Sequence, residues 1–345
     1  MDRKEALARL AALPPVEPDQ EYAIDHFRPE DALGVGRLYY EIYGDAYPVD
    51  TPYIPERFVE ETAKGHILCV VARTPSGDIL GASSVYRSSS PNPGCYEIGQ
   101  TLILRAYRMG RIVFRLYDFK IRNVLPDPRV KAVFGEAVCH HVVTQKFSLR
   151  VGALPTGLEC SLMPEAAYAG EGAVGRASCL FFGRVNRDRH SLVHTPPCYS
   201  GELAVLYQGL NLDRAAGQPQ EPTEDCASSM KVEHFAGAGV VRAHLSLAGA
   251  DLAERLDSVE AGNPAVVQVY VNLADPGCPW AVELLRGRGW FLGGLCPAWF
   301  VSDGLLMQKL AAPPDFDRLQ LFNDRARAVV DMVRADYRRP AGGAA

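Results

Sequence analysis

The fold is decided by one stretch, Tyr96-Glu97-Ile98-Gly99-Gln100-Thr101-Leu102-Ile103-Leu104-Arg105-Ala106-Tyr107-Arg108. Residues 96–104 are an apolar run that is typical of a buried strand, and residues 112–123 have the apolar spacing of a helix. The basic turn 105–111 joins the two. A turn and a helix N-terminus leave main-chain N–H groups free, and the helix dipole adds positive potential. The pattern therefore predicts an anion-binding site at this turn.

Outward from this stretch, the sequence predicts an antiparallel meander that leads into a β-α-β unit. Two apolar runs before it are separated by the turn Pro75-Ser76-Gly77-Asp78, which is typical of a hairpin. The elements expected around the turn are helices near 28–43 and 55–64, strands 66–73 and 79–86, strand 130–138, helix 145–151 and a further strand. This order indicates an α+β fold rather than a doubly wound one.

The sequence predicts a weak internal repeat that relates the second half of the chain to the first. Strand 130–138, helix 145–151 and Gly152 correspond to strand 266–273, helix 279–288 and Gly289. The other elements expected there are strands 177–185, 230–247, 290–300 and 304–310 and helices 197–210, 251–259 and 315–338, with an exposed loop at 214–229. We interpret this as two mixed β-sheet halves flanked by helices, although common β-α-β units could coincide by chance.

We expect three segments: an N-terminal arm at 1–20, a first domain at 21–170, and a second domain at 171–345 that ends in a helix.

Composition excludes several classes of protein. The net charge is −5. A protein that binds the phosphates of nucleic acid usually has an excess of basic residues, so nucleic acid is not expected as a partner. No apolar run approaches the roughly 20 residues that span a bilayer. The N-terminus is too polar for a secretion signal, so we expect a cytoplasmic protein. The nine scattered cysteines contain no C-x-x-C pair, which predicts buried reduced thiols and no metal site.

Residues 98–152 follow the order of a known family. An acid-Ile-Gly opening, an apolar strand, a polar turn ending in Tyr107-Arg108 and a helix resemble the central part of the Gcn5-related N-acetyltransferase (GNAT) superfamily. The wider resemblance covers about residues 25–165. It implies a site for acetyl-CoA or another acyl-CoA, with the pyrophosphate at the turn. The residues that it assigns to this site are Leu102, Ile103, Leu104, Arg108, Met109, Gly110, Arg111, Ile112 and Val113.

The sequence departs from the family pattern at several positions. Of the glycines in the family's phosphate loop only Gly110 remains, and Met109 and Arg111 carry side chains that could obstruct a phosphate. Arg108 and Arg111 could instead form charge-assisted contacts with it. Ser148 stands where the family often has a Tyr that protonates the leaving thiolate. A basic helix start without a ligand remains the alternative.

Four residues are candidates for the acid or base of a transfer reaction. Glu97 lies at the start of the central strand, where several members of the family place their general base. His140 and His141 follow a strand and titrate near neutrality. Glu136 lies on that strand, where the alternative is a pair with an Arg or Lys. An ordinary salt bridge or a backbone-bonded histidine is the alternative for the others.

The resemblance implies an acyl-CoA-dependent N-acyltransferase for a small-molecule or peptide amine. The alternatives are an aminoacyl-tRNA-dependent transferase and a non-catalytic binding or sensor protein. In the second half, the turn Ala248-Gly249-Ala250-Asp251 has no arginine, and Asp251 would repel a pyrophosphate. We therefore expect no cofactor there. The sequence does not indicate the acceptor or the oligomeric state.

Overall fold

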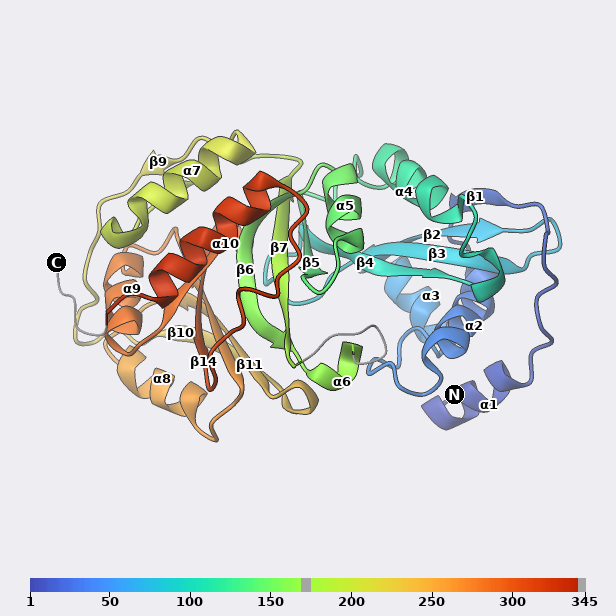
Figure 1. The fold of residues 1–345 in the computed structure, drawn as a ribbon, viewed down its shortest axis with the longest axis horizontal. Coiled ribbons are helices and arrows are strands. Elements are labelled where there is room, and N and C mark those ends of the chain that lie inside the picture. Colours follow the sequence, from blue (N-terminus) through green and yellow to red (C-terminus); the bar gives the residue numbers. More distant parts are fainter. Residues whose placement is uncertain (169–174, 341–345) are drawn as a thin grey trace. The chain divides into compact units, whose positions relative to one another are not determined.

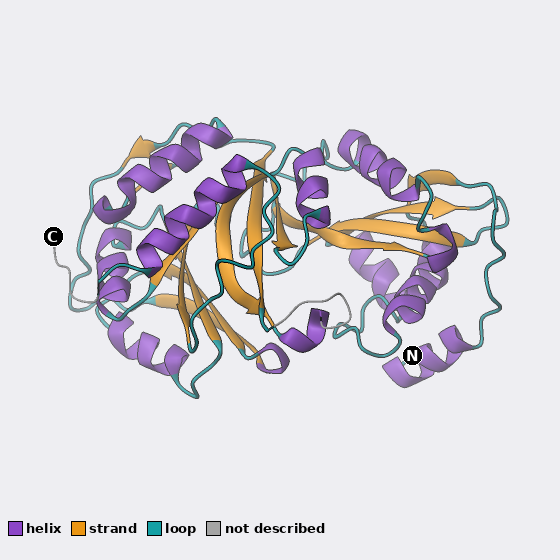
Figure 2. Ribbon diagram, viewed as in Figure 1, coloured by secondary structure: helices purple, strands orange, loops and turns teal. Residues whose placement is uncertain are grey.

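The computed structural model describes residues 1–168 and 175–340. The chain divides into two units, one made of residues 1–89 and 96–130 and the other of residues 90–95 and 131–345. Figure 1 labels their elements, and Figure 2 shows helices lying against strands in each unit. The expected domain boundary at residues 170 and 171 lies outside the described residues, so it stays a prediction.

The first unit is an antiparallel sheet with helices on both faces. The strand order is β1-β2-β3-β4, and each strand is antiparallel to its neighbour. Helix α4 covers one face of the sheet, and α2 and α3 cover the other (Figure 1). The elements are α1 (Arg3–Ala11), β1 (Ala23–His26), η1 (Pro29–Asp31), α2 (Ala32–Tyr43), α3 (Pro55–Ala63), β2 (Ile67–Arg73), β3 (Ile79–Tyr86), β4 (Cys95–Ile103), η2 (Arg105–Tyr107) and α4 (Ile112–Asn123).

Part of the expected N-terminal arm, residues 1–20, is a packed helix. The side chain of Leu10 in α1 is buried and lies beside Gly36 of α2, where a Cβ would come within 3.2 Å of it. The Arg3 guanidinium forms an ion pair with Asp50 at 2.8 Å. Helix α1 is therefore anchored to the first unit.

The second unit contains a mixed sheet with the order β5-β7-β6-β13-β14-β12-β11-β10. Strands β11 and β12 are parallel, and the other neighbours are antiparallel. The elements are β5 (Ala132–Val138), α5 (Val143–Arg150), β6 (Leu154–Met163), α6 (Glu165–Tyr168), β7 (Ala177–Val185), β8 (Leu192–Val193), η4 (Pro197–Tyr199), α7 (Ser200–Leu210), β9 (Ala215–Ala216), β10 (Ser229–Phe235), η5 (Ala236–Ala238), β11 (Val240–Leu247), α8 (Leu252–Glu260), β12 (Val266–Asn272), α9 (Cys278–Gly287), β13 (Phe291–Cys296), β14 (Gly304–Leu310) and α10 (Asp324–Tyr337).

The internal repeat expected from the sequence has a counterpart in the topology of the second unit. In β5-α5-β6-β7, the first and second strands both pair antiparallel with the third strand. In β12-α9-β13-β14, the corresponding strands pair in the same way. The α+β fold class is confirmed, with a mixed sheet in the second unit and flanking helices.

The two repeats meet at a crossing of two glycines. Strands β6 and β13, which hold equivalent places in the repeats, pair antiparallel at Gly157 and Gly294. Gly294 has a φ of 135°, which residues with a side chain rarely adopt. A Cβ on Gly294 would come within 2.3 Å of the Gly157 Cα. Only glycine fits this close approach of two backbones.

The sheet of the second unit curves around a buried aromatic cluster. Phe134 of β5 and Tyr270 of β12 both contact the ring of Trp299, at centroid distances of 4.9 and 4.2 Å. In the sheet order, four strands separate β5 from β12. Their contact with one shared ring shows that the sheet folds back on itself, so residues from distant strands can meet inside it.

The structure differs from the expected elements at several places. The expected strand 290–300 ends at Cys296. The terminal helix starts at Asp324 and not at 315, because the Asn323 side chain caps its first turn by accepting a hydrogen bond from the Ala326 N–H at 2.9 Å. Strand β1 was not expected, since four residues are too few for a clear period. The expected loop 214–229 contains the two-residue strand β9, which pairs in parallel with β8.

Candidate functional site

Strand β4 contains a β-bulge at Gln100. Its register with β3 shifts between the pairs Ala82↔Leu102 and Ser84↔Gly99, and Gln100 has a φ of 51°. An extra residue in one strand reverses the alternation of side chains beyond it. The Thr101 hydroxyl therefore reaches the face that α4 covers, whereas Gln100 reaches the connection between α2 and α3.

The turn after β4 is held by main-chain and side-chain hydrogen bonds. The Leu104 N–H donates to the Leu80 carbonyl at 2.9 Å, and the Gly110 N–H donates to the Tyr107 carbonyl at 3.2 Å. The Tyr107 hydroxyl donates to the Glu17 carbonyl at 2.8 Å and accepts from the Gln20 N–H at 3.0 Å. Tyr107 thus ties the turn to the segment that follows α1.

Exposed arginines cluster at this turn. Arg105, Arg108 and Arg111 are spaced three residues apart and are exposed to solvent. In the described part of the chain, none of them has an acidic partner at ion-pair distance. The Arg108 Nε donates to the Ile103 carbonyl at 3.2 Å. Helix α4 begins directly after the turn, and the main-chain N–H groups of its first turn have no acceptor within the helix. The turn therefore concentrates positive potential without an internal counter-charge.

The residues that replace the family's glycines leave the turn open. The Met109 side chain is fully exposed. A Cβ on Gly110 would meet only the Tyr107 carbonyl, at 3.4 Å. Leu102, Leu104 and Ile112 are buried, so their side chains are not exposed to a ligand.

Glu97 lies beside a group of tyrosines in the first unit. The Tyr47 hydroxyl accepts a hydrogen bond from the Gln100 Nε2 at 3.2 Å, and its ring contacts those of Tyr39 and Tyr43 at 4.9 and 5.2 Å. Burial raises the pKa of Tyr47 to about 12, and the nearby Glu97 carboxylate contributes to the increase. Glu97 is half-buried in this polar, aromatic environment.

A second polar cluster, which the sequence analysis missed, lies under α4. The Lys120 Nζ donates to the Ser83 Oγ at 2.6 Å, and the Ser83 Oγ is 2.7 Å from the Thr101 Oγ1. The Tyr117 hydroxyl is 3.4 Å from the Thr101 Oγ1. One signal was available: Lys120 continues the spacing of the buried residues Ile112 and Leu116, so the apolar face of the helix contains a lysine.

The other acid–base candidates lie in the second unit. The ring centroids of His140 and His141 are 4.5 Å apart, and the His141 Nδ1 accepts a hydrogen bond from the Val143 N–H at 3.3 Å. Ser148, at the family's tyrosine position, donates to the Thr144 carbonyl at 3.1 Å. Glu97 and the cofactor candidates thus lie in one unit, and the histidines in the other. Their catalytic roles stay predictions.

Glu136 belongs to a buried charge network. Its carboxylate pairs with the Arg242 guanidinium at 3.2 Å, and Glu159 pairs with the same guanidinium at 3.2 Å. The Gln268 Nε2 and the Tyr270 hydroxyl donate to the Glu159 Oε1 at 2.8 and 3.1 Å. Burial, reinforced by the Glu136 charge, raises the pKa of Glu159 to about 8. This pairing of Glu136 is the alternative that the sequence left open.

In the corresponding turn of the second half, residues 248–251, main-chain N–H groups are already hydrogen-bonded within the chain. Three successive main-chain N–H groups have internal acceptors: Ala248 donates to Asp275 Oδ2 (2.7 Å), Gly249 to Ser228 Oγ (3.0 Å) and Ala250 to the Cys226 carbonyl (2.8 Å). The Asp251 carboxylate accepts from the Ser228 N–H at 2.6 Å. The groups that would bind a phosphate are therefore already used.

Strands β11 and β12 pair in parallel over most of their length in the second half. Their register runs without a break from Val240↔Val266 to Leu245↔Val271. Beyond it, the Asn272 Nδ2 donates to the Ser246 carbonyl at 3.1 Å, which ties the strand ends together. An open hollow of about 580 Å³ lies beside these ends, lined in part by Phe300 and Val301. Main-chain groups from Val240 to Leu245 of β11 are thus already paired with β12 in this half.

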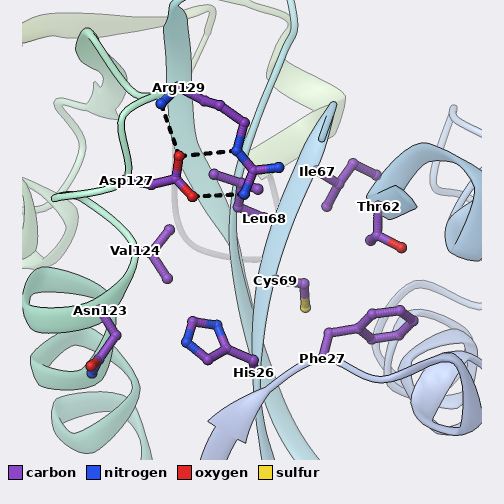
Figure 3. A pocket seen from close by; sticks show the side chains of 10 residues that line it. All are labelled: His26, Phe27, Thr62, Ile67, Leu68, Cys69, Asn123, Val124, Asp127 and Arg129. Atoms are coloured by element: carbon purple, nitrogen blue, oxygen red, sulfur yellow. Dashed lines mark hydrogen bonds and ion pairs between the residues drawn. The ribbon is translucent and has the colours of Figure 1, made fainter. Parts of the chain in front are cut away.

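Figure 3 shows a separate pocket of about 150 Å³ in the first unit. It lies at the start of β2 and near the C-terminal end of α4, and His26 and Asn123 are among its lining residues. The Asp127 carboxylate and the Arg129 guanidinium at its rim are paired with each other at 2.6 Å. None of the candidate site residues lines this pocket.

Other features of the described residues limit the chemistry of the chain. Over residues 1–168 and 175–340, no group of three or more His, Cys, Asp or Glu side chains could hold a metal ion. None of the helices in that part of the chain is both long enough and apolar enough to span a bilayer. All nine cysteines are free thiols, and seven of them are buried.

Several solved acetyltransferase structures are similar to part of this chain. No family model and no curated protein matches the chain. A GNAT-family acetyltransferase from Streptococcus pneumoniae matches with a TM-score of 0.40 and 13% identity, over 48% of this chain and 99% of that one.

Ribosomal-protein-S5-alanine acetyltransferase from Vibrio fischeri matches with a TM-score of 0.38 and 12% identity, over 50% of this chain and 98% of that one. An aminoglycoside 6′-N-acetyltransferase solved with coenzyme A matches with a TM-score of 0.35 and 13% identity, over 48% of this chain and 98% of that one. Each of these matches spans about half of this chain and almost the whole of the acetyltransferase.

Proposed function

We propose that this chain is an acyl-CoA-dependent N-acyltransferase whose acceptor is a small-molecule or peptide amine. The observation that carries the proposal is the turn between β4 and α4, where exposed arginines and the start of a helix follow a bulged strand. The acyl donor is acetyl-CoA or a CoA thioester with a longer acyl group.

The turn suits a pyrophosphate for electrostatic reasons. A pyrophosphate carries negative charge that favours the N-terminus of a helix. Arg105, Arg108 and Arg111 have no acid at ion-pair distance in the described residues, so their guanidinium groups remain available for charge-assisted hydrogen bonds. These contacts would replace the close backbone approach that glycines give other members of the family.

The transfer itself needs a proton acceptor and a main-chain donor. The amine nitrogen attacks the thioester carbonyl carbon, and the carbon–sulfur bond breaks. A main-chain N–H near Ile103 stabilises the oxyanion. Glu97 takes the proton of the acceptor ammonium, since it lies on the central strand beside the bulge and is half-buried. His141 is the second candidate for this base.

The second half contributes no cofactor site to this proposal. Its equivalent turn donates its main-chain N–H groups to residues 226–228 and to Asp275, and its parallel strands are paired from Val240↔Val266 to Leu245↔Val271. We therefore expect one CoA for each chain.

Isothermal titration calorimetry with acetyl-CoA and free CoA tests the cofactor site. Arg108→Ala is compared with Arg122→Ala, which removes the same charge from the last turn of α4. That position is roughly 15–20 Å from the turn at 1.5 Å per residue. Loss of affinity in the first variant alone supports the proposal. No binding to the wild-type protein at millimolar CoA would refute it.

Turnover is measured with a panel of primary amines, and the CoA that each reaction releases is quantified by chromatography. A thiol reagent is unsuitable, because Cys198 and Cys226 are partly exposed and would react with it. Binding of CoA without turnover on any amine would instead favour a sensor protein.

A further inference from the structure

A fully buried lysine lies beneath the proposed cofactor face of the first unit. Lys120 has no exposed surface, and no carboxylate of the described residues is at ion-pair distance. Its Nζ donates to the Ser83 Oγ at 2.6 Å and lies 4.3 Å from the centroid of the Tyr117 ring. Lysine is almost never fully buried unless it is paired. Burying an amine without an acidic partner destabilises the fold, so we looked for a function of Lys120.

Two hydroxyl groups connect this amine to the central strand. From the Lys120 Nζ the path runs 2.6 Å to the Ser83 Oγ and a further 2.7 Å to the Thr101 Oγ1. Thr101 is partly exposed, whereas Ser83 and Lys120 are buried. Each hydroxyl can donate and accept at once, so the chain can pass a proton between the strand surface and the amine.

The position of Thr101 points toward the acyl donor. The bulge at Gln100 places the Thr101 side chain on the face of the sheet that α4 covers. The proposed pyrophosphate site is at the N-terminus of the same helix. Thr101 directly precedes residues 102–104, whose main chain would face the thioester. Glu97, in contrast, lies beside the tyrosines of the α2–α3 connection.

The surroundings make the Lys120 proton labile. The titratable and charged groups on the elements around α4 are Asp25 and His26 of β1, Glu30 and Asp31 of η1, Cys69 and Arg73 of β2, Tyr86 of β3, and Cys95, Tyr96 and Glu97 of β4. Helix α4 itself carries Arg115, Tyr117, Asp118 and Arg122 besides Lys120. Asp25 and Arg73 pair with each other at 3.0 Å. Burial raises the pKa of the Cys69 thiol to about 12 and lowers that of Lys120 to about 7.

We infer that Lys120 supplies, through Ser83 and Thr101, the proton that the departing CoA thiolate takes up. This inference rests on the proposed function. In this role Lys120 replaces the general acid that a tyrosine provides in the family, because Ser148 stands at the tyrosine position and its hydroxyl is not acidic. Lys120 touches no reacting atom itself, so it is a positioning residue that acts through Thr101.

The protons balance in this scheme. The amine nitrogen bonds to the acyl carbon, the carbon–sulfur bond breaks, and Glu97 takes one ammonium proton while the second is released to water. The thiolate takes the Thr101 proton, Thr101 takes that of Ser83, and Ser83 takes one from the Lys120 ammonium. Lys120 then regains a proton from water along the same path through Thr101 and Ser83, and Glu97 returns its own to water.

The first test is the titration of Lys120 itself, which does not require turnover. The protein is labelled with ¹³C at the lysine Cε atoms, and the spectra are recorded from pH 5 to 10. We expect one signal with a midpoint near 7 that is absent in Lys120→Met. That signal should persist in Thr101→Val, which interrupts only the path. A Lys120 midpoint near 10 would overturn the inference.

The second test is the pH profile of acyl transfer from acetyl-CoA. Wild-type turnover should fall as pH rises above about 7, because the ammonium is lost. Lys120→Met, Ser83→Ala and Thr101→Val should each lower turnover at pH 7 by roughly 10²–10⁴-fold and lose this dependence. Their affinity for CoA should stay that of the wild type. Lys120→Arg keeps the charge but cannot release a proton, so it should not restore the rate.

The outcomes separate the two proposals. An unchanged pH profile in Thr101→Val or Lys120→Met, with turnover and CoA binding intact, refutes the relay and leaves the acyltransferase standing. A wild-type protein that neither binds CoA nor acylates an amine refutes the proposed function and the relay together. Thermal unfolding of each variant identifies a loss of fold.

Discussion

Replacing Lys120 by methionine should stabilise the first unit, and by an amount that depends on pH. Burial lowers the pKa of the folded chain's Lys120 from the ordinary 10.5 to about 7. Each pH unit of difference corresponds to about 1.4 kcal/mol, so keeping the charged amine buried costs up to about 5 kcal/mol. Methionine fills a similar volume without that charge, and removing a buried charge in this way is often stabilising.

The sign of the pH dependence follows from proton binding. Below pH 7 the folded and unfolded chains both hold the Lys120 proton, so the folded chain bears the whole cost. Between pH 7 and 10.5 the unfolded chain still binds the proton and the folded chain does not. Wild-type stability must therefore rise with pH over this window. From pH 7 to pH 9 the advantage of Lys120→Met should shrink by about 2–3 kcal/mol.

Hydrogen exchange of peptides from β3 and α4 measures this effect in the first unit alone. Tryptophan fluorescence would not serve, since Trp280, Trp290 and Trp299 all lie in the second unit. Comparing variant and wild type at the same pH cancels the intrinsic exchange rates. A difference that stays flat from pH 6 to pH 9 would show that Lys120 is charged in the folded protein and would refute the reasoning.

Four further outcomes are expected. Arg108→Ala should weaken CoA binding by about 1–3 kcal/mol in calorimetry, the scale of a hydrogen bond to a charged group; Arg122→Ala should leave it unchanged. Glu97→Gln should lower turnover by roughly 10²–10⁴-fold at unchanged CoA affinity, and if His141→Ala does so instead, the base is His141. Titration should saturate at one CoA for each chain, and a value of two would contradict the assignment of the second half. Arg242→Met should cost about 3–5 kcal/mol in urea unfolding monitored by tryptophan fluorescence at pH 9, above the pKa of about 8 at which Glu159 becomes charged, because it leaves two carboxylates without their partner; a loss below 1 kcal/mol at that pH would mean that the acids stay neutral.

The order of elements could be predicted because the apolar periods are strong and local. The run 96–104 forms β4 and the spacing of 112–123 forms α4, as their patterns indicate. The bulge at Gln100 could not be predicted in this way, since it depends on how β4 pairs with a strand elsewhere in the sequence. The arginines of the turn were partly recognised: Arg108 and Arg111 were assigned to the site, and Arg105 was not.

The buried polar groups were the hardest part to predict. The pairing of Arg242 with Glu136 joins residues that are 106 positions apart in the chain, and nothing local to either residue indicates it. Lys120 was overlooked for a different reason. A lysine on a helix is normally read as solvent-exposed, although its spacing from Ile112 and Leu116 placed it on the buried face.

The crossing of Gly157 and Gly294 has a consequence for synthesis on the ribosome. Strand β6 leaves the ribosome well before its neighbour β13, whose paired glycine is 137 residues further along the chain. At 5–20 residues per second this interval is roughly 7–30 s. During that time β6 presents an unpaired edge, which is open to association with other chains. Pairing of β6 with β7 does not cover this edge, because β7 lies on the opposite side of β6, so the duplicated architecture is complete only when synthesis is nearly finished.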